Sequence, residues 1–180
     1  VLPVDSYFTS NETAQRCLEI FESVVDEDLS QHTWIEPGAG HGSFLDVFPS
    51  EKKIGVDIVN RMPYVETADF LTWSPDKNKK HVTLGNPPFG VRGAIALAFL
   101  NRSLLWSDYV GFILPMSFLS NGKGTNMKRV QNGHLVFSKV LEKESFISPD
   151  NGKTVQVNTL FQVWKQGDGP SFFKEYDVSD

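Results

Sequence analysis

The sequence contains a single cysteine, Cys17, and no long run of apolar residues. One cysteine excludes an internal disulfide and gives no sign of secretion, so we expect an intracellular protein of the cytoplasm or nucleus. No segment approaches the roughly 20 apolar residues that a membrane-spanning helix needs, so we expect no membrane partner. The chain starts at Val1 without a signal-like segment, which suggests a fragment of a longer protein. Its four histidines lack the close spacing of a zinc site, so no metal is expected.

Internal repeats, low-complexity tracts and linkers are also absent. A length of 180 residues, with 40% of them hydrophobic and 22% charged, is typical of one globular domain and argues against disorder. Short apolar runs alternate with helical patterns, which predicts an α/β domain with a mostly parallel sheet. Two strands near the end flank the turn signal Pro149–Gly152 and are expected to pair. The expected helices cover residues 11–25 and 94–105, and the expected strands cover 33–35, 54–58, 81–84, 109–114, 145–147 and 155–164.

The net charge of −5 hides an asymmetry between two parts of the chain. Residues 77–141, which we call the basic segment, hold nine basic residues and one acidic residue, a charge of +8, whereas the remainder carries −13. This separation of charge suggests that one face binds an anion. The alternative is a chance run of solvated lysines.

A glycine loop follows the first expected strand, with Gly38, Gly40 and Gly42 at alternate positions between Pro37 and Ser43. Glycine lets the backbone turn sharply and approach a ligand, and an expected helix behind the loop would present free N–H groups. Ser43 stands where a dinucleotide-binding G-x-G-x-x-G motif has its third glycine, so NAD binding fits less well. A purely structural turn is the alternative.

Asp57 ends the second expected strand, about 20 residues beyond the glycines. A carboxylate in this place usually accepts two O–H hydrogen bonds from a ribose diol. Asp57 could instead cap the next turn. Glu36 is likewise either a ligand contact or an acid near the amino end of a helix.

The sequence Asn86-Pro87-Pro88-Phe89, which we call the NPPF loop, follows the expected strand 81–84. Its two prolines remove two N–H donors and stiffen the loop, which leaves its carbonyls as acceptors. The Asn86 side-chain oxygen adds another acceptor, and Phe89 offers a flat apolar face. Two convergent acceptors beside an aromatic face suit a planar amino-bearing group, such as an adenine or an amide. A plain proline-rich turn is the alternative.

With the glycine loop, Asp57 and the NPPF loop in this order, the sequence resembles the class I S-adenosylmethionine-dependent methyltransferases of the N6-adenine type. It is most similar to the DNA adenine methyltransferases whose cofactor loop precedes the catalytic loop. The resemblance implies one catalytic domain over residues 1–180 with a Rossmann-like fold: a seven-stranded, mostly parallel sheet with an antiparallel last strand and helices on both faces. It also implies S-adenosyl-L-methionine as cofactor and methyl transfer to N6 of adenine in nucleic acid, with DNA slightly favoured over RNA.

The resemblance also assigns roles to individual residues. The segment before the first helix would touch the methionine part of the cofactor, although Ser10 stands where the family usually has proline. Asp69 would bind the amino group of the cofactor's adenine, and Phe70 would pack against the ring. The implied catalytic residues are Asn86, Pro87, Pro88 and Phe89. The implied cofactor contacts are Tyr7, Phe8, Thr9, Glu36, Pro37, Gly38, Gly40, Gly42, Phe44, Asp57, Ile58, Asp69, Phe70 and Asn86.

The substrate is expected to meet residues beyond the NPPF loop. Phe89 would stack on the target base, and Lys123, Lys128 and Arg129 are candidate phosphate contacts in a glycine-rich part of the basic segment. A mobile surface loop with no ligand is the alternative. Because 180 residues leave little room for target recognition, we expect a protein partner or a missing domain to supply it.

Two other functions stay open. Protein glutamine N5-methyltransferases carry a similar Asn-Pro-Pro-Tyr loop, because an amide presents the same NH₂ group. Phe89 in place of tyrosine, and the basic segment, argue modestly against that substrate. A non-catalytic subunit that keeps the fold is the third possibility, and the intact Asn86 and Asp57 weigh against it.

Overall fold

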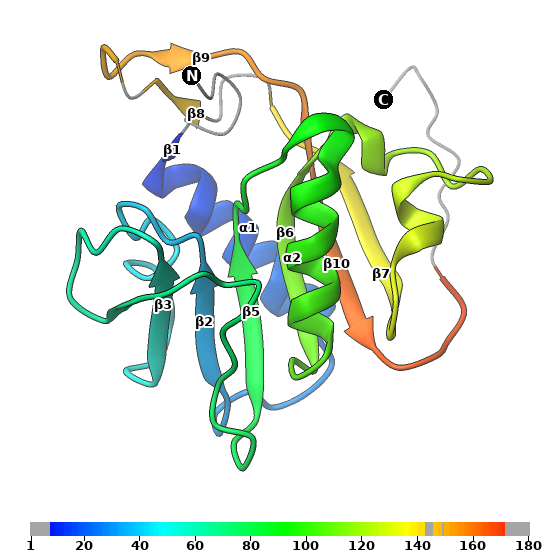
Figure 1. Ribbon diagram of the computed structural model, residues 1–180, viewed down its shortest axis with the longest axis horizontal. Coiled ribbons are helices and arrows are strands. Elements are labelled where there is room, and N and C mark those ends of the chain that lie inside the picture. Colours follow the sequence, from blue (N-terminus) through cyan, green and yellow to red (C-terminus); the bar gives the residue numbers. More distant parts are fainter. Residues whose placement is uncertain (1–7, 143–145, 149, 172–180) are drawn as a thin grey trace.

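The computed structural model describes residues 8–142, 146–148 and 150–171 (Figure 1). Seven strands form one sheet in the order β4-β3-β2-β5-β6-β10-β7. Neighbouring strands are parallel, except that β10 runs antiparallel to both β6 and β7. The predicted mostly parallel sheet with an antiparallel last strand is therefore confirmed. The strands are β2 (Thr33–Pro37), β3 (Lys53–Asp57), β4 (Val65–Thr67), β5 (His81–Gly85), β6 (Tyr109–Pro115), β7 (Gly133–Val140) and β10 (Thr159–Gln166).

Helices cover both faces of this sheet, as expected (Figure 1). Helix α1 (Asn11–Val24) lies on one face and α2 (Ala94–Leu104) on the other. Ser10 begins α1 by accepting the Thr13 N–H on its Oγ at 3.2 Å, which satisfies one of the free donors of the first turn. None of the helices in these residue ranges has the length and hydropathy to cross a bilayer.

The apolar stripe of α1 packs directly on the middle of the sheet. Gly111 of β6 permits this contact, because a Cβ at that position would lie 2.9 Å from the Phe21 ring. Cys17 belongs to the same stripe and is fully buried. Burial raises the pKa of its thiol to about 12, so Cys17 is a core residue and not a reactive thiolate.

A second, three-stranded antiparallel sheet lies beyond the carboxyl ends of the parallel strands (Figure 1). The predicted pairing of 145–147 with 155–164 is therefore correct only in part. The second segment divides into two strands, and only the first of them pairs with β8, whereas the second, β10, joins the large sheet. Ser145 and Pro149 fall outside the described residues. The strands of the small sheet are β1 (Phe8–Thr9), β8 (Phe146–Ile147) and β9 (Thr154–Val155).

The strand β7 is not among those that the sequence predicts. It forms the edge of the sheet, and β10 is its neighbour. Its apolar residues are interrupted by His134, Ser138 and Lys139, and much of the strand is only half-buried. An edge strand needs less apolar character than a central one, so its pattern resembled a loop.

Candidate active site

Three segments that are distant in sequence meet at the carboxyl ends of β2 and β5. A Cβ on Gly38 would lie 3.4 Å from the Pro88 Cδ, so the glycine loop touches the NPPF loop. Gly38 has a φ of 59°, a left-handed conformation that favours glycine. The Phe8 ring packs edge-on against His41 of the glycine loop, with 4.3 Å between ring centroids. The expected cofactor and catalytic segments are therefore adjacent, although Tyr7 falls outside the described residues.

Asp57 ties the end of β3 to the glycine loop. Its Oδ2 accepts the Gly40 N–H at 2.8 Å, and its Oδ1 accepts the Val59 N–H at 2.9 Å. The next residue, Ile58, is 73% exposed. The half-buried carboxylate of Asp57 and the exposed apolar side chain of Ile58 are thus adjacent at the end of β3.

Glu36 holds the glycine loop from inside. The side chain is buried, and its carboxyl oxygens accept the N–H groups of Phe44 at 3.3 Å and Leu45 at 3.0 Å. The predicted helix after the loop is instead a series of turns over residues 40–47, and Glu36 satisfies two N–H groups of these turns. Burial raises the pKa of Glu36 to about 8.

The raised pKa of Glu36 predicts a pH-dependent stability. Because the folded pKa of about 8 exceeds the ordinary 4.5, the carboxyl's stabilising effect is complete below pH 4.5 and is lost as the pH rises through 8. We expect the stability of the wild type to fall by about 3–5 kcal/mol relative to Glu36→Gln over this range. Thermal or urea unfolding from pH 5 to 9 measures it, with the exposed Glu51→Gln as control; parallel wild-type and Glu36→Gln curves would refute the assignment.

Other predicted cofactor residues of this loop face the interior. Phe44 is fully buried and lies 6.5 Å from Phe48 between ring centroids. A Cβ on Gly42 would come within 3.0 Å of Met62, and Pro37 is buried at the end of β2. For Phe44 in particular, the interior position leaves mainly backbone atoms for contact with a ligand.

The side chain of Asn86 has a defined orientation. Its Nδ2 donates to the Thr9 Oγ1 at 3.1 Å, and the Thr9 carbonyl accepts the Ser43 Oγ–H at 2.6 Å. The Asn86 Oδ1 is buried, and no described residue donates a hydrogen bond to it. One residue of β1 therefore connects the glycine loop to the NPPF loop and leaves a single acceptor atom without a donor.

The aromatic residue of the NPPF loop is less accessible than the sequence suggests. Phe89 is 6% exposed, so the expected flat face is largely covered. Its carbonyl accepts the N–H groups of Ile95 and Ala96 at 3.1 and 3.2 Å, which joins the loop to the first turn of α2. This attachment, together with the two preceding prolines, fixes the loop backbone.

Asp69 and Phe70 differ in their exposure. Asp69 is exposed, and its Oδ1 accepts the Leu71 N–H at 3.0 Å. Phe70 is buried in an aromatic cluster, with its ring centroid 5.0 Å from that of Phe99. Phe99 in turn would lie 3.7 Å from a Cβ on Gly38. Phe70 thus reaches the glycine loop through Phe99.

Two of the three candidate phosphate contacts lie in an element that contacts α2. Lys123, Lys128 and Arg129 are exposed, and the last two belong to the short helix η3 (Asn126–Arg129). The Arg129 carbonyl accepts the Asn101 Nδ2–H at 3.1 Å. Asn101 is about two turns along α2 from the NPPF loop, so Arg129 lies at some distance from Asn86.

The structure brings a further residue of η3, Asn126, to Arg92, three residues beyond the NPPF loop. Asn126 is buried, and its Nδ2 donates to the Arg92 carbonyl and to the Ser117 Oγ, both at 2.9 Å. The sequence gives no signal for this contact, because 34 positions separate Asn126 from Arg92.

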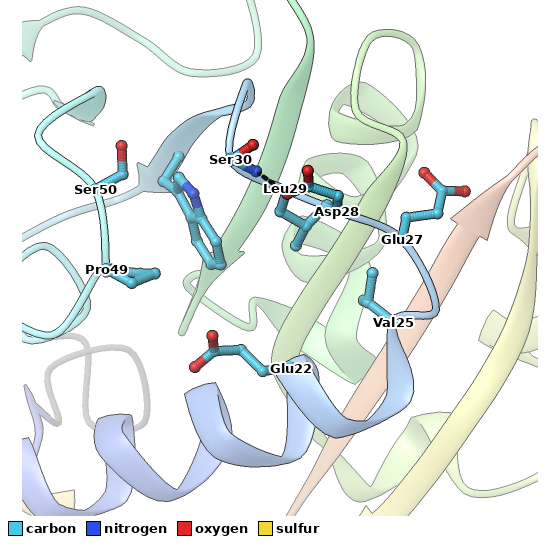
Figure 2. A pocket seen from close by; sticks show the side chains of 9 residues that line it. Glu22, Val25, Glu27, Asp28, Leu29, Ser30, Pro49 and Ser50 are labelled. Carbon is cyan, nitrogen blue, oxygen red and sulfur yellow. Dashed lines mark hydrogen bonds between the residues drawn. The ribbon is translucent and has the colours of Figure 1, made fainter.

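A cavity of about 420 Å³ is lined mainly by residues that precede β2 and β3, at the amino ends of these strands (Figure 2). Its lining includes Glu22, Glu27 and Asp28, and no basic residue among those that the structure describes. The acidic lining and the position at the opposite edge of the sheet separate this cavity from the NPPF loop.

Beside this cavity, Glu27, His32 and Asp108 have ligand atoms within 4.8 Å of one another and could hold a metal ion, which the histidine spacing did not suggest. Each already has a protein partner. His32 Nε2 lies 2.7 Å from Asp108 Oδ2, and the Tyr109 hydroxyl donates to Glu27 at 3.2 Å. Hydrogen bonds within the protein account for this cluster.

Comparisons with known proteins identify the fold. No family model matches the sequence, and no curated protein is similar to it in sequence. A presumed RNA methyltransferase from Pyrococcus horikoshii is similar in structure, with 14% identity, a TM-score of 0.69, and coverage of 93% of this chain and 90% of that one. A presumed class I S-adenosylmethionine-dependent methyltransferase from Listeria monocytogenes has 12% identity, a TM-score of 0.63 and coverage of 96% and 65%. The 23S rRNA methyltransferase ErmE has 15% identity, a TM-score of 0.55 and coverage of 89% and 70%. Together with the strand order described above, these likenesses show that the chain has the Rossmann-like fold of the class I methyltransferases.

Proposed function

We propose that this chain transfers a methyl group from S-adenosyl-L-methionine to the exocyclic N6 of adenine in nucleic acid. The observation that carries the proposal is the orientation of Asn86. Thr9 takes a donor of the amide, and Oδ1 is left buried without a donor among the described residues. An unsatisfied buried acceptor costs about 1–3 kcal/mol, so an NH₂ group that enters the site gains an acceptor already oriented to receive it.

The residues around the glycine loop fit this cofactor. Each oxygen of Asp57 accepts one backbone N–H and keeps a second lone pair, which two ribose hydroxyls could use. The exposed Ile58 offers apolar surface to an adenine ring, and the exposed Asp69 offers an acceptor to an adenine amino group. When bound, the cofactor supplies an electrophilic methyl group on a sulfonium sulfur.

The NPPF loop would activate a weak nucleophile. The lone pair of an adenine NH₂ is delocalised into the ring, which makes this nitrogen a poor nucleophile. Hydrogen bonds from the NH₂ group to the Asn86 Oδ1 and the Pro87 carbonyl would favour a pyramidal nitrogen with a localised lone pair and would stabilise the charge that develops on it. The proton becomes acidic as the nitrogen reacts, so it can pass to water without a strong base. Stacking of the base on Phe89 requires this side chain to leave its covered position.

Nucleic acid is the substrate class that the charge distribution favours. The basic segment supplies the exposed Lys123, Lys128 and Arg129 in the chain between β6 and β7. A base inside a duplex would have to be flipped out to reach Asn86, whereas an unpaired base would not. The motif order favours DNA slightly, but two structurally similar proteins are named as RNA methyltransferases. Both nucleic acids are therefore tested as substrates.

A protein glutamine side chain is the second candidate substrate, because its amide carries the same NH₂ group that the Asn86 Oδ1 would accept. The experiment is to incubate the protein with methyl-labelled cofactor and separate pools of RNA, DNA and protein, then digest each pool and identify the labelled product. We expect N6-methyladenosine or its deoxy form. Labelled N5-methylglutamine would assign the alternative substrate, and no labelled product from any pool would favour a non-catalytic subunit.

A further inference from the structure

We propose that Arg92 binds a backbone phosphate next to the target adenine, and that Asn126 is the positioning residue that holds Arg92 in place. This inference rests on the proposed function. It names a contact of the same site, three residues beyond Phe89, that the resemblance does not assign. Arg92 belongs to the short helix η1 (Val91–Gly93), which joins the NPPF loop to α2.

The backbone of Arg92 is strained. Its φ of 56° and ψ of 25° lie in the left-handed region, which costs a residue with a Cβ about 1–2 kcal/mol. Gly90 and Gly93 on either side also have positive φ, at 71° and 75°, but glycine adopts this conformation without strain. A strained residue persists only where its surroundings determine its conformation, and such residues occur often at binding sites.

Asn126 holds the backbone of Arg92 in this conformation. Its Nδ2 donates to the Arg92 carbonyl at 2.9 Å and to the Ser117 Oγ at the same distance, so a buried amide joins η1 to the segment after β6. The fit around it is close, because a Cβ on Gly93 would lie 2.7 Å from the Ser117 Oγ and 2.9 Å from the Asn126 Nδ2. The direction in which Arg92 leaves the loop is therefore fixed by residues from three segments.

The side chain of Arg92 is available to a ligand. Arg92 is exposed, as is Val91, and no described residue forms an ion pair or hydrogen bond with the guanidinium. A guanidinium presents two parallel N–H groups that match two phosphate oxygens, and it stays charged at any physiological pH.

Other cations of the basic segment either lie away from Asn86 or already have hydrogen-bond partners. The group at 77–80 precedes β5 and so lies at the amino edge of the sheet, away from Asn86. The guanidinium of Arg102 is already bound to the Trp73 carbonyl and the Ser74 Oγ. Among the basic residues of this segment, Arg92 is therefore the one that the fold attaches directly to the catalytic loop.

The test of Arg92 uses Arg92→Asn, because asparagine tolerates the left-handed conformation and removes only the charge and the guanidinium. Binding of short fluorescent single-stranded RNA and DNA oligonucleotides that contain adenine is measured from low to moderate salt. We expect about tenfold weaker binding at low salt and a salt slope smaller by about 0.7, the loss of one phosphate contact. Arg92→Lys should recover part of the affinity, and cofactor binding should not change. Lys79→Asn, which removes a cation at the opposite edge, is the matched control and should bind as the wild type does.

The role of Asn126 is tested by a double-mutant cycle. Asn126→Ala should weaken oligonucleotide binding several-fold in the wild type but add little in the Arg92→Asn background, because it acts through Arg92. A merely structural role would lower the melting temperature and weaken binding equally in both backgrounds.

Two results would overturn the inference: wild-type affinity and salt slope in Arg92→Asn, or an equal loss in Lys79→Asn. Failure of the proposed function is a separate result, seen as the absence of methylated adenine with the wild-type protein. If the wild type methylates adenine and Arg92→Asn binds normally, only the assignment of Arg92 falls. If the wild type binds no oligonucleotide, both fall.

Discussion

Replacing Asn86 with alanine is expected to lower the methyl-transfer rate about 100- to 1,000-fold, while the affinity for S-adenosyl-L-methionine changes by less than about threefold. The variant removes a buried acceptor at the end of β5 that has no donor among the described residues. The reacting nitrogen would then lose the hydrogen bond that favours its pyramidal form. Single-turnover methyl transfer and calorimetric titration of the cofactor measure the two quantities separately.

Two further variants separate the acceptor of Asn86 from its anchor. Thr9→Val keeps the Asn86 Oδ1 but removes the hydroxyl that accepts its Nδ2–H, so the amide can rotate, and we expect a smaller loss of rate. Asn86→Asp keeps an acceptor but cannot donate to Thr9, and it places a negative charge in the site. Wild-type turnover in Asn86→Ala would refute the catalytic assignment of the NPPF loop.

Replacing Asp57 with alanine is expected to weaken cofactor binding about 10- to 100-fold. Hydrogen bonds to a charged group contribute about 1.5–3 kcal/mol, and Asp57 both anchors the Gly40 N–H and would accept the ribose hydroxyls. The apparent KM for the cofactor should rise, and kcat at saturating cofactor should change little, because Asp57 would hold the ribose and not the reacting nitrogen.

Asp57→Asn is the matched control for this prediction. It keeps one acceptor oxygen and a similar volume but loses the charge, so its affinity should lie between those of the wild type and Asp57→Ala. Thermal unfolding without cofactor should show whether the fold is intact. Equal cofactor affinity in all three proteins would contradict the ribose assignment.

The fold could be predicted from the sequence wherever a strand is central and its end carries a motif. The strands that end at Pro37, Asp57 and Gly85 are short apolar runs that fall close to the predicted places. Gly38 follows the first strand, Asp57 ends the second, and Asn86 follows the third. Their order along the chain and the parallel geometry bring the motifs to one edge. The local pattern of apolar residues was sufficient to predict these strands, because a central strand is buried on both faces of the sheet and therefore needs apolar residues.

The differences arise where a distant partner decides the outcome. Residues 40–47 resembled the start of a helix but form turns, which the distant Glu36 holds through the N–H groups of Phe44 and Leu45. Phe89 was expected to show an open face, but it is covered in the structure. The contact between Asn126 and Arg92 depends on the path of the chain after β6, about which no local pattern carries information.

The position of β10 has a consequence for how the protein is made. This strand is the last of the sheet in sequence, yet it lies between β6 and β7, and β7 pairs with it. During synthesis β7 emerges with no neighbour in the sheet and must wait until residues 159–166 leave the ribosome. Until then an unpaired strand edge is open to pairing with other chains. Completion of the sheet is therefore a late, non-local step, which is a slow kind of folding event. Chains stalled before Thr159 should be the form most dependent on chaperones.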